Sequence, residues 1–149
     1  MNKTGNIDII KAYLGTKSLS YNNAFVGTYH LISVIPETNK LLYISSDGNT
    51  VTPYRSYGMG IVSNTYEDEV GTIICNKPIT EIPYLCYKNV SRLKEITLPE
   101  CVTNIGESAF SDSGLRNINL QEGLRSIGVD AFFNTNLSSI TLPSTIELL

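Results

Sequence analysis

The stretch ITLPECVTNIGESAF, residues 96–110, decides the fold of this chain, because similar stretches recur later in the sequence. Residues 118–132 read INLQEGLRSIGVDAF, 22 positions later, and residues 140–146 begin a third copy with ITLPSTI. The columns that stay apolar in every copy are Leu93, Leu115 and Leu137; Ile96, Ile118 and Ile140; Leu98, Leu120 and Leu142; Val102, Leu124 and Ile146; Ile105 and Ile127; Ala109 and Ala131; and Phe110 and Phe132. A period in the twenties with fixed apolar columns indicates a solenoid, in which neighbouring copies bury one another.

Each copy contains the pattern of a strand followed by a return segment. Ile96 and Leu98 alternate with Thr97, which is the period of a strand with one buried face. Pro99 then ends the strand, because proline cannot donate to a ladder. Gly106 is expected where the backbone needs positive φ or close approach. Ala109-Phe110 is expected to fill the interior, with coils stacked at the ~4.8 Å spacing of neighbouring strands.

A weaker copy precedes these at a spacing of 23, in TIICNKPITEIPYLCYKNVSRL, residues 72–93. In this copy Pro83 replaces the glycine, Cys86 the alanine and Tyr87 the phenylalanine, as expected of an end copy that meets a cap. The sequence therefore predicts about 3.5 copies over residues 73–149, the last one incomplete.

These copies resemble the BspA-like leucine-rich repeat, whose pattern runs L-x-x-I-x-L-P-x-x-V-x-x-I-G-x-x-A-F. The resemblance rests on LKEITLPECVTNIGESAF and LRNINLQEGLRSIGVDAF, and Gln121 replaces the usual proline in the second. It implies a leucine-rich-repeat solenoid, mostly β with short helical turns. It also implies a secreted or cell-surface bacterial protein that adheres to other proteins or cells.

Residues 1–72 carry no such repeat and are expected to form a small mixed α+β cap over the N-terminal end of the repeats. GNIDIIKAYLGT, residues 5–16, predicts a short helix between Asn6 and Gly15. LLYISSDGNTVTPY, residues 41–54, predicts a β-hairpin about Asp47-Gly48. Residues 58–75 predict another strand, an acidic turn and entry into the repeats.

Composition excludes several classes of function. The 11 basic residues are scattered and the net charge is −3, which gives no footprint for nucleic acid or for an anionic membrane. No apolar run approaches the ~20 residues of a membrane span. The first residues do not form a signal peptide, so the chain as written would stay in the cytoplasm, whereas the resemblance implies a secreted or surface address. Both addresses stay open.

Candidate catalytic groups do not converge in the sequence. His30 is the one histidine, and a catalytic pair would need Cys75, Cys86 or Cys101 beside it. Those three cysteines have no metal-ligand spacing and are expected to remain packed thiols. The run Glu67-Asp68-Glu69 lacks the alternation of a calcium loop and is expected to be a solvated turn. We therefore expect a protein that is not an enzyme and that holds no cofactor and no metal.

Two surfaces are candidates for binding. The outward positions of the repeat strands form a polar ladder of Glu95, Thr97, Asn117, Asn119, Ser139 and Thr141, which Thr72 and Ile74 could continue. The alternative is a plain solvated sheet face. Tyr54, Tyr57 and Tyr66 flank a glycine-rich loop and could give rigid contact area, or could serve only for packing within the cap.

The expected function is recognition of a protein or cell-surface ligand. The alternative is a structural spacer or assembly module of a larger surface or phage-like protein. That alternative rests on Phe132, Ile140, Leu142 and Ile146, which the incomplete last copy would leave poorly covered. It predicts that the chain is a piece of a longer protein or that it self-associates through its C-terminal end.

Overall fold

The computed structural model describes residues 37–147, which lie within one compact unit, Val34–Leu149. The helix expected over residues 5–16 lies outside the described residues, as does His30. The described strands are β1 Lys40–Ser45, β2 Ile61–Glu67, β3 Val70–Cys75, β4 Glu81–Ile82, β5 Leu93–Thr97, β6 Asn104–Ile105, β7 Asn117–Asn119 and β8 Ser126–Ile127.

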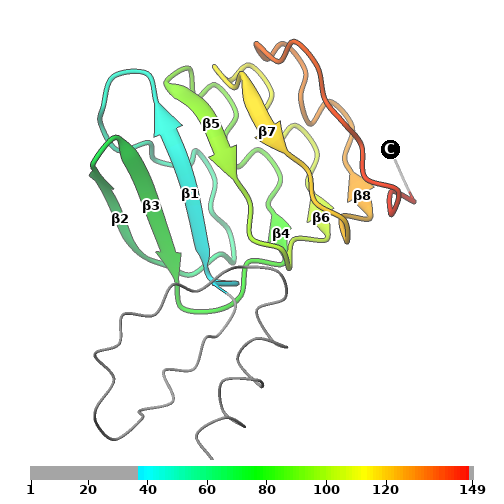
Figure 1. Ribbon diagram of the computed structural model, residues 1–149, viewed down its shortest axis with the longest axis horizontal. Helices are drawn as coiled ribbons and strands as arrows, with labels where there is room; N and C mark the ends of the chain where they lie inside the picture. The colour runs from blue at the N-terminus through cyan, green and yellow to red at the C-terminus, as the bar shows by residue number, and fades with distance from the viewer. Residues whose placement is uncertain (1–36, 148–149) are drawn as a thin grey trace, which may run out of the picture. The chain divides into compact units, whose positions relative to one another are not determined.

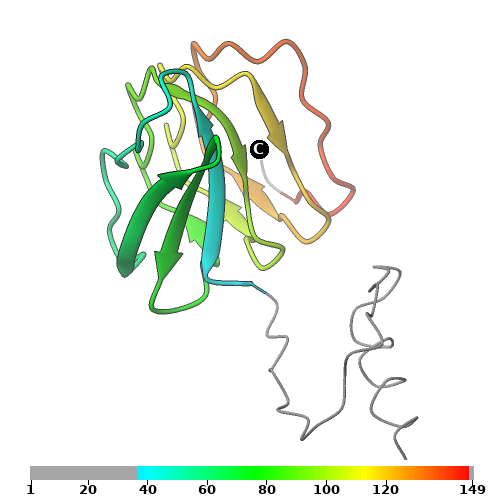
Figure 2. The same ribbon diagram turned by 60° about the vertical axis from the view of Figure 1, so that its left-hand side comes forward.

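The strands form two sheets (Figure 1). One has five strands in the order β2-β3-β1-β5-β7, and the other has the three short strands β4-β6-β8. A single apolar core contains residues from both sheets, such as Leu41 and Ile73 from the first and Ile82 and Ile105 from the second. Figure 2 shows the short sheet behind the longer one, with the chain passing from one to the other in each coil.

Successive copies stack as parallel coils at the period of the repeat. Ile96 pairs with Ile118 between β5 and β7, and Ile105 pairs with Ile127 between β6 and β8. The predicted stacking of these copies is therefore confirmed at the strands of both sheets.

The return segments are chains of tight turns, and the expected short helical turns are absent from residues 37–147. Ala109 N–H bonds the carbonyl of Gly106, Ser111 that of Ser108, and Ser113 that of Phe110. A residue with positive φ interrupts this series twice, at Ser108 and at Asp112. Because a helix needs consecutive residues with negative φ, these left-handed residues stop a helix from propagating.

Aromatic side chains form a column through the core. The rings of Tyr87 and Phe110 lie parallel with centroids 5.5 Å apart, and those of Phe110 and Phe132 lie parallel at 5.4 Å. Tyr87 and Phe110 are fully buried, whereas Phe132 is half-buried at the last coil. The expectation that this column fills the interior is confirmed.

The glycine column allows the coils to approach closely. A Cβ added to Gly106 would lie 2.6 Å from the nitrogen of Tyr84, and one added to Gly128 would collide with the backbone of Glu107. Neither glycine has positive φ. Of the two reasons predicted for this column, close approach is the one that applies.

The weaker copy is split between the two sheets. Its second half stacks as predicted, with Ile82 paired to Ile105 between β4 and β6. Its strand β3, however, does not lie beside β5, because β1 is inserted between them and runs antiparallel to both. The 23-residue spacing of the weaker copy aligns Ile73 with Ile96, and the structure does not place these two residues side by side.

The predicted hairpin about Asp47-Gly48 is also wrong, because residues 46–60 form no strand and β1 pairs with β3 and β5 instead. Long-range bonds hold the segment instead. Arg92 Nη1 donates to Asp47 Oδ2 at 2.9 Å, and Arg92 Nη2 donates to the Thr50 carbonyl at 3.1 Å. The hairpin of this region joins β2 to β3 at Asp68 and Glu69, whose φ values are +49° and +67°. The acidic run is thus the solvated turn that the sequence predicts.

A buried tyrosine organises the inner face of β1, β2 and β3. The ring of Tyr43 covers Gly71, where any Cβ would collide with it. The Tyr43 hydroxyl donates to Asn64 Oδ1 at 2.7 Å and accepts from the Val51 N–H at 3.0 Å. Burial raises the pKa of this phenol, so it stays protonated as a donor. The network fixes the loop after β1 against the sheet.

Candidate functional site

The outer face of the five-stranded sheet brings the predicted ladder together. From Glu95 to Thr97 in β5 and from Asn117 to Asn119 in β7, two outward residues flank an isoleucine that packs against the core, as the pleat of a strand requires. Glu95 pairs with Asn117 and Thr97 pairs with Asn119 in adjacent rows. Both rows therefore lie side by side on one surface.

One hollow of about 320 Å³ lies over this face. Its lining includes all six residues of the predicted ladder, namely Glu95, Thr97, Asn117, Asn119, Ser139 and Thr141. Ser139 and Thr141 belong to the last copy, which runs beside β7 without forming a strand. The hollow is also lined by the apolar residues of the same three segments, Ile96, Ile118, Leu120 and Ile140.

The polar groups of the hollow are hydrogen-bond donors and acceptors. Asn117 Nδ2 donates to Glu95 Oε1 at 3.0 Å, which holds both side chains over the sheet. The six residues supply amides, hydroxyls and one carboxylate. Such a set suits recognition of a polar surface, and it contains no nucleophile paired with a base.

The rows continue into β1, which the sequence did not predict. Leu42 pairs with Thr97, and Ile44 pairs with Glu95. Thr72 and Ile74, the predicted continuation, lie one strand further away in β3. The outer face is therefore polar over β5 and β7 and apolar over β1. The sequence contains a signal for this, since four consecutive apolar residues at 41–44 place apolar side chains on both faces.

The tyrosine candidates separate into two places. Tyr54 and Tyr57 are exposed and surround Arg55, whose Cζ lies 5.7 Å and 5.6 Å from their ring centroids. Tyr84 completes this group, with its ring 5.9 Å from the same atom. Tyr66 is not part of it, because its ring packs toward Tyr43 and its hydroxyl donates to the Glu69 carbonyl. The Tyr84 contribution was missed because it comes from the weaker copy, 27 residues beyond Tyr57.

The cysteines are free thiols, and their surroundings make them poor nucleophiles. Burial raises the pKa of both Cys75 and Cys86, and Cys86 Sγ lies 3.7 Å from Met59 Sδ in the core. Burial also raises the pKa of the half-buried Cys101, whose thiol points at the Ile79 carbonyl. Since the thiolate is the reactive form, none of the three is activated.

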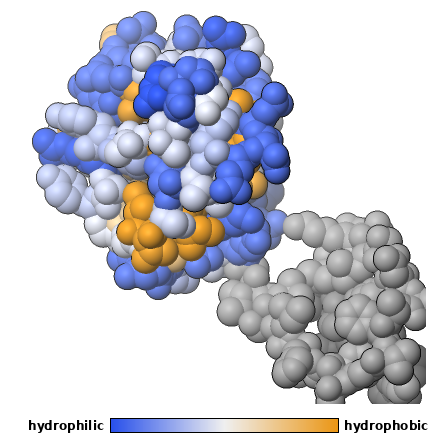
Figure 3. Space-filling view, turned by 90° about the vertical axis from the view of Figure 1, so that its left-hand side faces the viewer, coloured by the Kyte–Doolittle hydropathy of each residue, from blue (hydrophilic) through white to orange (hydrophobic). Residues whose placement is uncertain are grey.

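Metal ligands do not gather within residues 37–147: no three side chains of the ligating types come together there. The same part of the chain has no helix long and apolar enough to span a bilayer. Figure 3 shows the face on the side of β2, the edge strand, which is mostly hydrophilic with one large hydrophobic patch and a few smaller apolar spots.

A comparison with protein families gives a match to the BspA type leucine rich repeat region (6 copies), over residues 63–149. This chain belongs to that family. The match begins before the expected start at Ile73 and takes in most of β2 and all of β3. A comparison with curated proteins gives no match.

Leucine-rich repeat regions of the BspA type are in general protein-recognition modules, typically not enzymes, and are often associated with the cell surface.

Proposed function

We propose that the stacked coils form a solenoid that recognises a protein ligand at a cell surface, without enzymatic activity, and that the outer face of the five-stranded sheet is its binding surface. The observation that carries this proposal is that the six outward residues of three copies line one hollow. Repeat proteins commonly bind partners on the surface that repetition makes continuous.

The mixed character of this face supports the proposal. The apolar side chains of Leu42 and Ile44 adjoin the polar rows of β5 and β7. An interface with an apolar region and a polar, hydrogen-bonding region is typical of specific complexes. Few side chains here are of the aromatic or arginine type that dominates binding energy, so a partner would be held by area and shape.

The test is a charge inserted on this face. Asn119→Arg should lower affinity at least roughly tenfold for a ligand found on an array of purified extracellular proteins, because it places a bulky cation in the hollow. Asn104→Arg is the matched control, since Asn104 is an exposed asparagine of β6 in the other sheet. Surface plasmon resonance measures both. Equal affinity of the two variants would contradict the proposed site.

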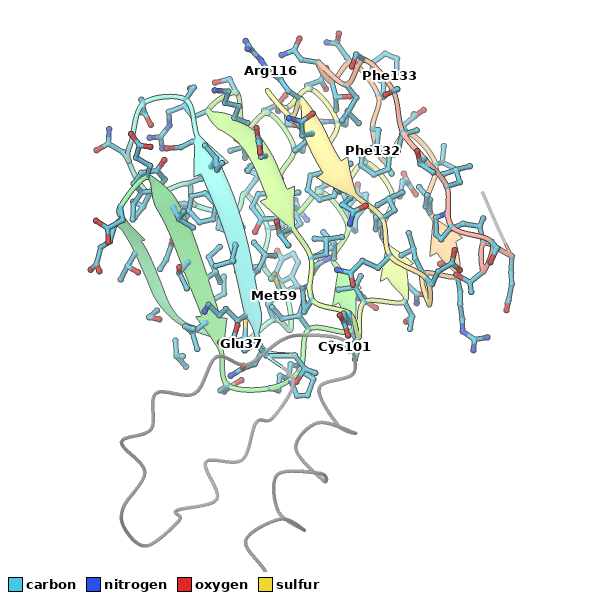
Figure 4. All side chains as sticks on the ribbon, in the orientation of Figure 1. Glu37, Met59, Cys101, Arg116, Phe132 and Phe133 are labelled. Atoms are coloured by element: carbon cyan, nitrogen blue, oxygen red, sulfur yellow. The ribbon has the colours of Figure 1, made fainter. Side chains whose placement is uncertain are left out.

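A second candidate function, assembly through the last coil, is favoured by a separate observation. Ser108, Phe110 and Asp112 each donate an N–H to a carbonyl of the following coil. The equivalent N–H groups of Asp130 and Phe132 have no backbone acceptor among residues 37–147. Figure 4 shows Phe132 and Phe133 close together at this end, and Phe133 is 61% exposed.

An extended segment that offers carbonyls at alternate residues would fit this end. Association should therefore raise the mass measured by light scattering as concentration increases, and Phe133→Asp should prevent the rise. Val62→Asp is the control, because Val62 is equally exposed, at 62%, on the edge strand β2. A mass that stays monomeric at all concentrations would remove this candidate.

A further inference from the structure

Beyond the proposed recognition of a protein by the sheet face, we propose a second binding site: the three tyrosines around Arg55 form a site for an acidic sugar, with the guanidinium binding the sugar's carboxylate. The site comprises Tyr54, Arg55, Tyr57 and Tyr84, and we refer to it as the arginine–tyrosine cluster.

The backbone of the cluster is held before any ligand arrives. The N–H groups of Tyr54 and Arg55 both bond the Cys86 carbonyl, at 2.7 Å and 3.3 Å, which ties the loop to the segment that carries Tyr84. Further along the loop, Met59 is buried in the core and its N–H bonds the Ser56 carbonyl. A ligand would therefore bind without ordering the loop, and binding to a preorganised site costs less entropy.

Two glycines direct the aromatic side chains outward. Gly58 and Gly60 have φ values of +74° and +68°, which other residues rarely adopt. These turns place Met59 in the core, while Tyr57 on the other side of Gly58 is 71% exposed. The sequence Tyr-Gly-Met-Gly is thus built to bury one side chain and to present another.

Within the described part of the chain, the N–H donors of the Arg55 guanidinium are free to bind a ligand. It forms no ion pair with any carboxylate of residues 37–147 and no side-chain hydrogen bond to them, whereas Arg92 and Arg125 each pair with a carboxylate. Three tyrosine rings lie near it, with their centroids 5.6 to 5.9 Å from Cζ. A half-buried arginine in this setting binds a carboxylate through two parallel N–H donors, and the rings limit competition from water.

A second cation reinforces the preference for an anion. Lys77 Nζ lies next to Gly58, 4.0 Å from where its Cβ would be, and Lys77 lines a hollow of about 260 Å³ together with Tyr57. Lys77 pairs with no carboxylate of the described residues. Glu81 also lines this hollow and Arg55 does not, so the sugar's carboxylate is assigned to Arg55, and Tyr57 is the residue that the hollow shares with the cluster.

The surroundings favour a sugar over a peptide. An extended peptide binds by adding main-chain hydrogen bonds to a strand edge, and here the two loop N–H groups are already used by Cys86. What remains is ring faces, phenolic hydroxyls and a guanidinium. A uronic acid has a matching set, because one face of its ring carries C–H groups, its edge carries hydroxyls, and its carboxylate projects from the ring.

The test uses a tetrasaccharide of galacturonic acid, the same tetrasaccharide with its carboxyls reduced to alcohols, and tetraglutamate. Isothermal titration calorimetry on the full chain should show binding of the acidic tetrasaccharide at least roughly tenfold tighter than of either other probe, as expected for a charge-assisted bond to a carboxylate. Binding of the acidic sugar should weaken as salt rises.

Matched variants keep the proposal falsifiable. Arg55→Ala should weaken binding at least roughly tenfold, and Arg116→Ala should leave it unchanged, since Arg116 is exposed and unpaired within the described residues. Tyr57→Ala should weaken binding while Tyr57→Phe retains it, and Tyr57 is too exposed for either change to unfold the chain. Three results would each overturn the proposal: equal binding of the reduced sugar, equal binding of tetraglutamate, or no binding of the acidic sugar at millimolar concentration.

Discussion

Gly128 lies so close to Glu107 of the preceding coil that a Cβ on the glycine would overlap the backbone of that residue. Backbone cannot move aside as the end of a side chain can. The two coils can therefore approach this closely only because residue 128 has no side chain. The hydrogen bond from the Gly128 N–H to the Ile105 carbonyl, 2.8 Å, joins the coils at the same place.

Gly128→Ala should therefore lower the free energy of unfolding by about 1–3 kcal/mol, the usual cost of overpacking. Gly48→Ala is the control, because a Cβ there meets nothing within 4 Å and its cost comes from the positive φ alone, about 1 kcal/mol. Urea denaturation measures both. A smaller loss for Gly128→Ala than for Gly48→Ala would contradict the role of close approach.

Tyr87→Phe should stabilise the protein. The Tyr87 hydroxyl is buried and has no hydrogen-bond partner among residues 37–147, and the two later copies have phenylalanine in this column. Removing an unsatisfied buried hydroxyl should raise the free energy of unfolding by about 1 kcal/mol. Thermal denaturation tests this, and a lower melting temperature for the variant would show that the hydroxyl has a partner.

Phe110→Ala should cost about 3–5 kcal/mol, because it removes the middle ring of the aromatic column and leaves a cavity. The same substitution at Phe133 should change the free energy of unfolding by less than about 0.5 kcal/mol, since this ring is mainly exposed. Similar losses in urea denaturation at both positions would mean that Phe133 is covered in solution, as the assembly candidate requires.

Alkaline pH should destabilise the fold through Cys86 and Tyr87. Burial raises the pKa of both groups, so the folded state keeps protons that the unfolded chain releases above about pH 8.5 for cysteine and pH 10 for tyrosine. The stability from these groups is complete below those values and falls as pH rises. The urea midpoint should decrease between pH 8 and pH 10, and less so in Cys86→Ala. A constant midpoint would contradict this.

Glu122 should respond in the opposite direction. Its carboxylate accepts from the N–H and the hydroxyl of Ser144 at 3.1 and 2.9 Å, and the N–H bond is the main cause that lowers its pKa. The contact is complete above the ordinary pKa of a glutamate and is lost as pH falls through the lowered value. The Ser144 amide resonance should shift with this titration, and Glu122→Gln should abolish the shift while Glu100→Gln preserves it.

The sequence predicted the repeats better than the cap for a physical reason. In the coils each apolar column meets its own copy, so Ile96 beside Ile118 follows from the period alone. In the cap nothing repeats, and the order of strands depends on distant partners. Asp47-Gly48 has the residue types of a hairpin turn, and the Asn49 N–H donates to the Asp47 side chain. The ion pair of Asp47 with the distant Arg92, however, holds the following segment away from β1, so that no hairpin forms.

The candidate site shows the same contrast, because its residues in the repeats were predicted and those outside the repeats were not. The ladder residues were found because they occupy outward positions of periodic strands. The contribution of β1 could not be predicted, because β1 ends 48 residues before β5 begins, runs antiparallel to it and is not part of the repeat. Tyr84 was missed for a related reason: it lies in the repeat column of Glu107 and Val129, which vary freely, so the period gives no reason to place it beside Arg55.

Because β1 runs antiparallel to β5, further coils could be added to the stack only on the side away from β1. A duplicated copy placed after β7 would meet a parallel neighbour with the same columns and extend the stack. A copy placed before β5 would have to displace β1, whose Leu42 and Ile44 pair antiparallel with residues of β5. Added copies would therefore lengthen the stack on the side away from β1.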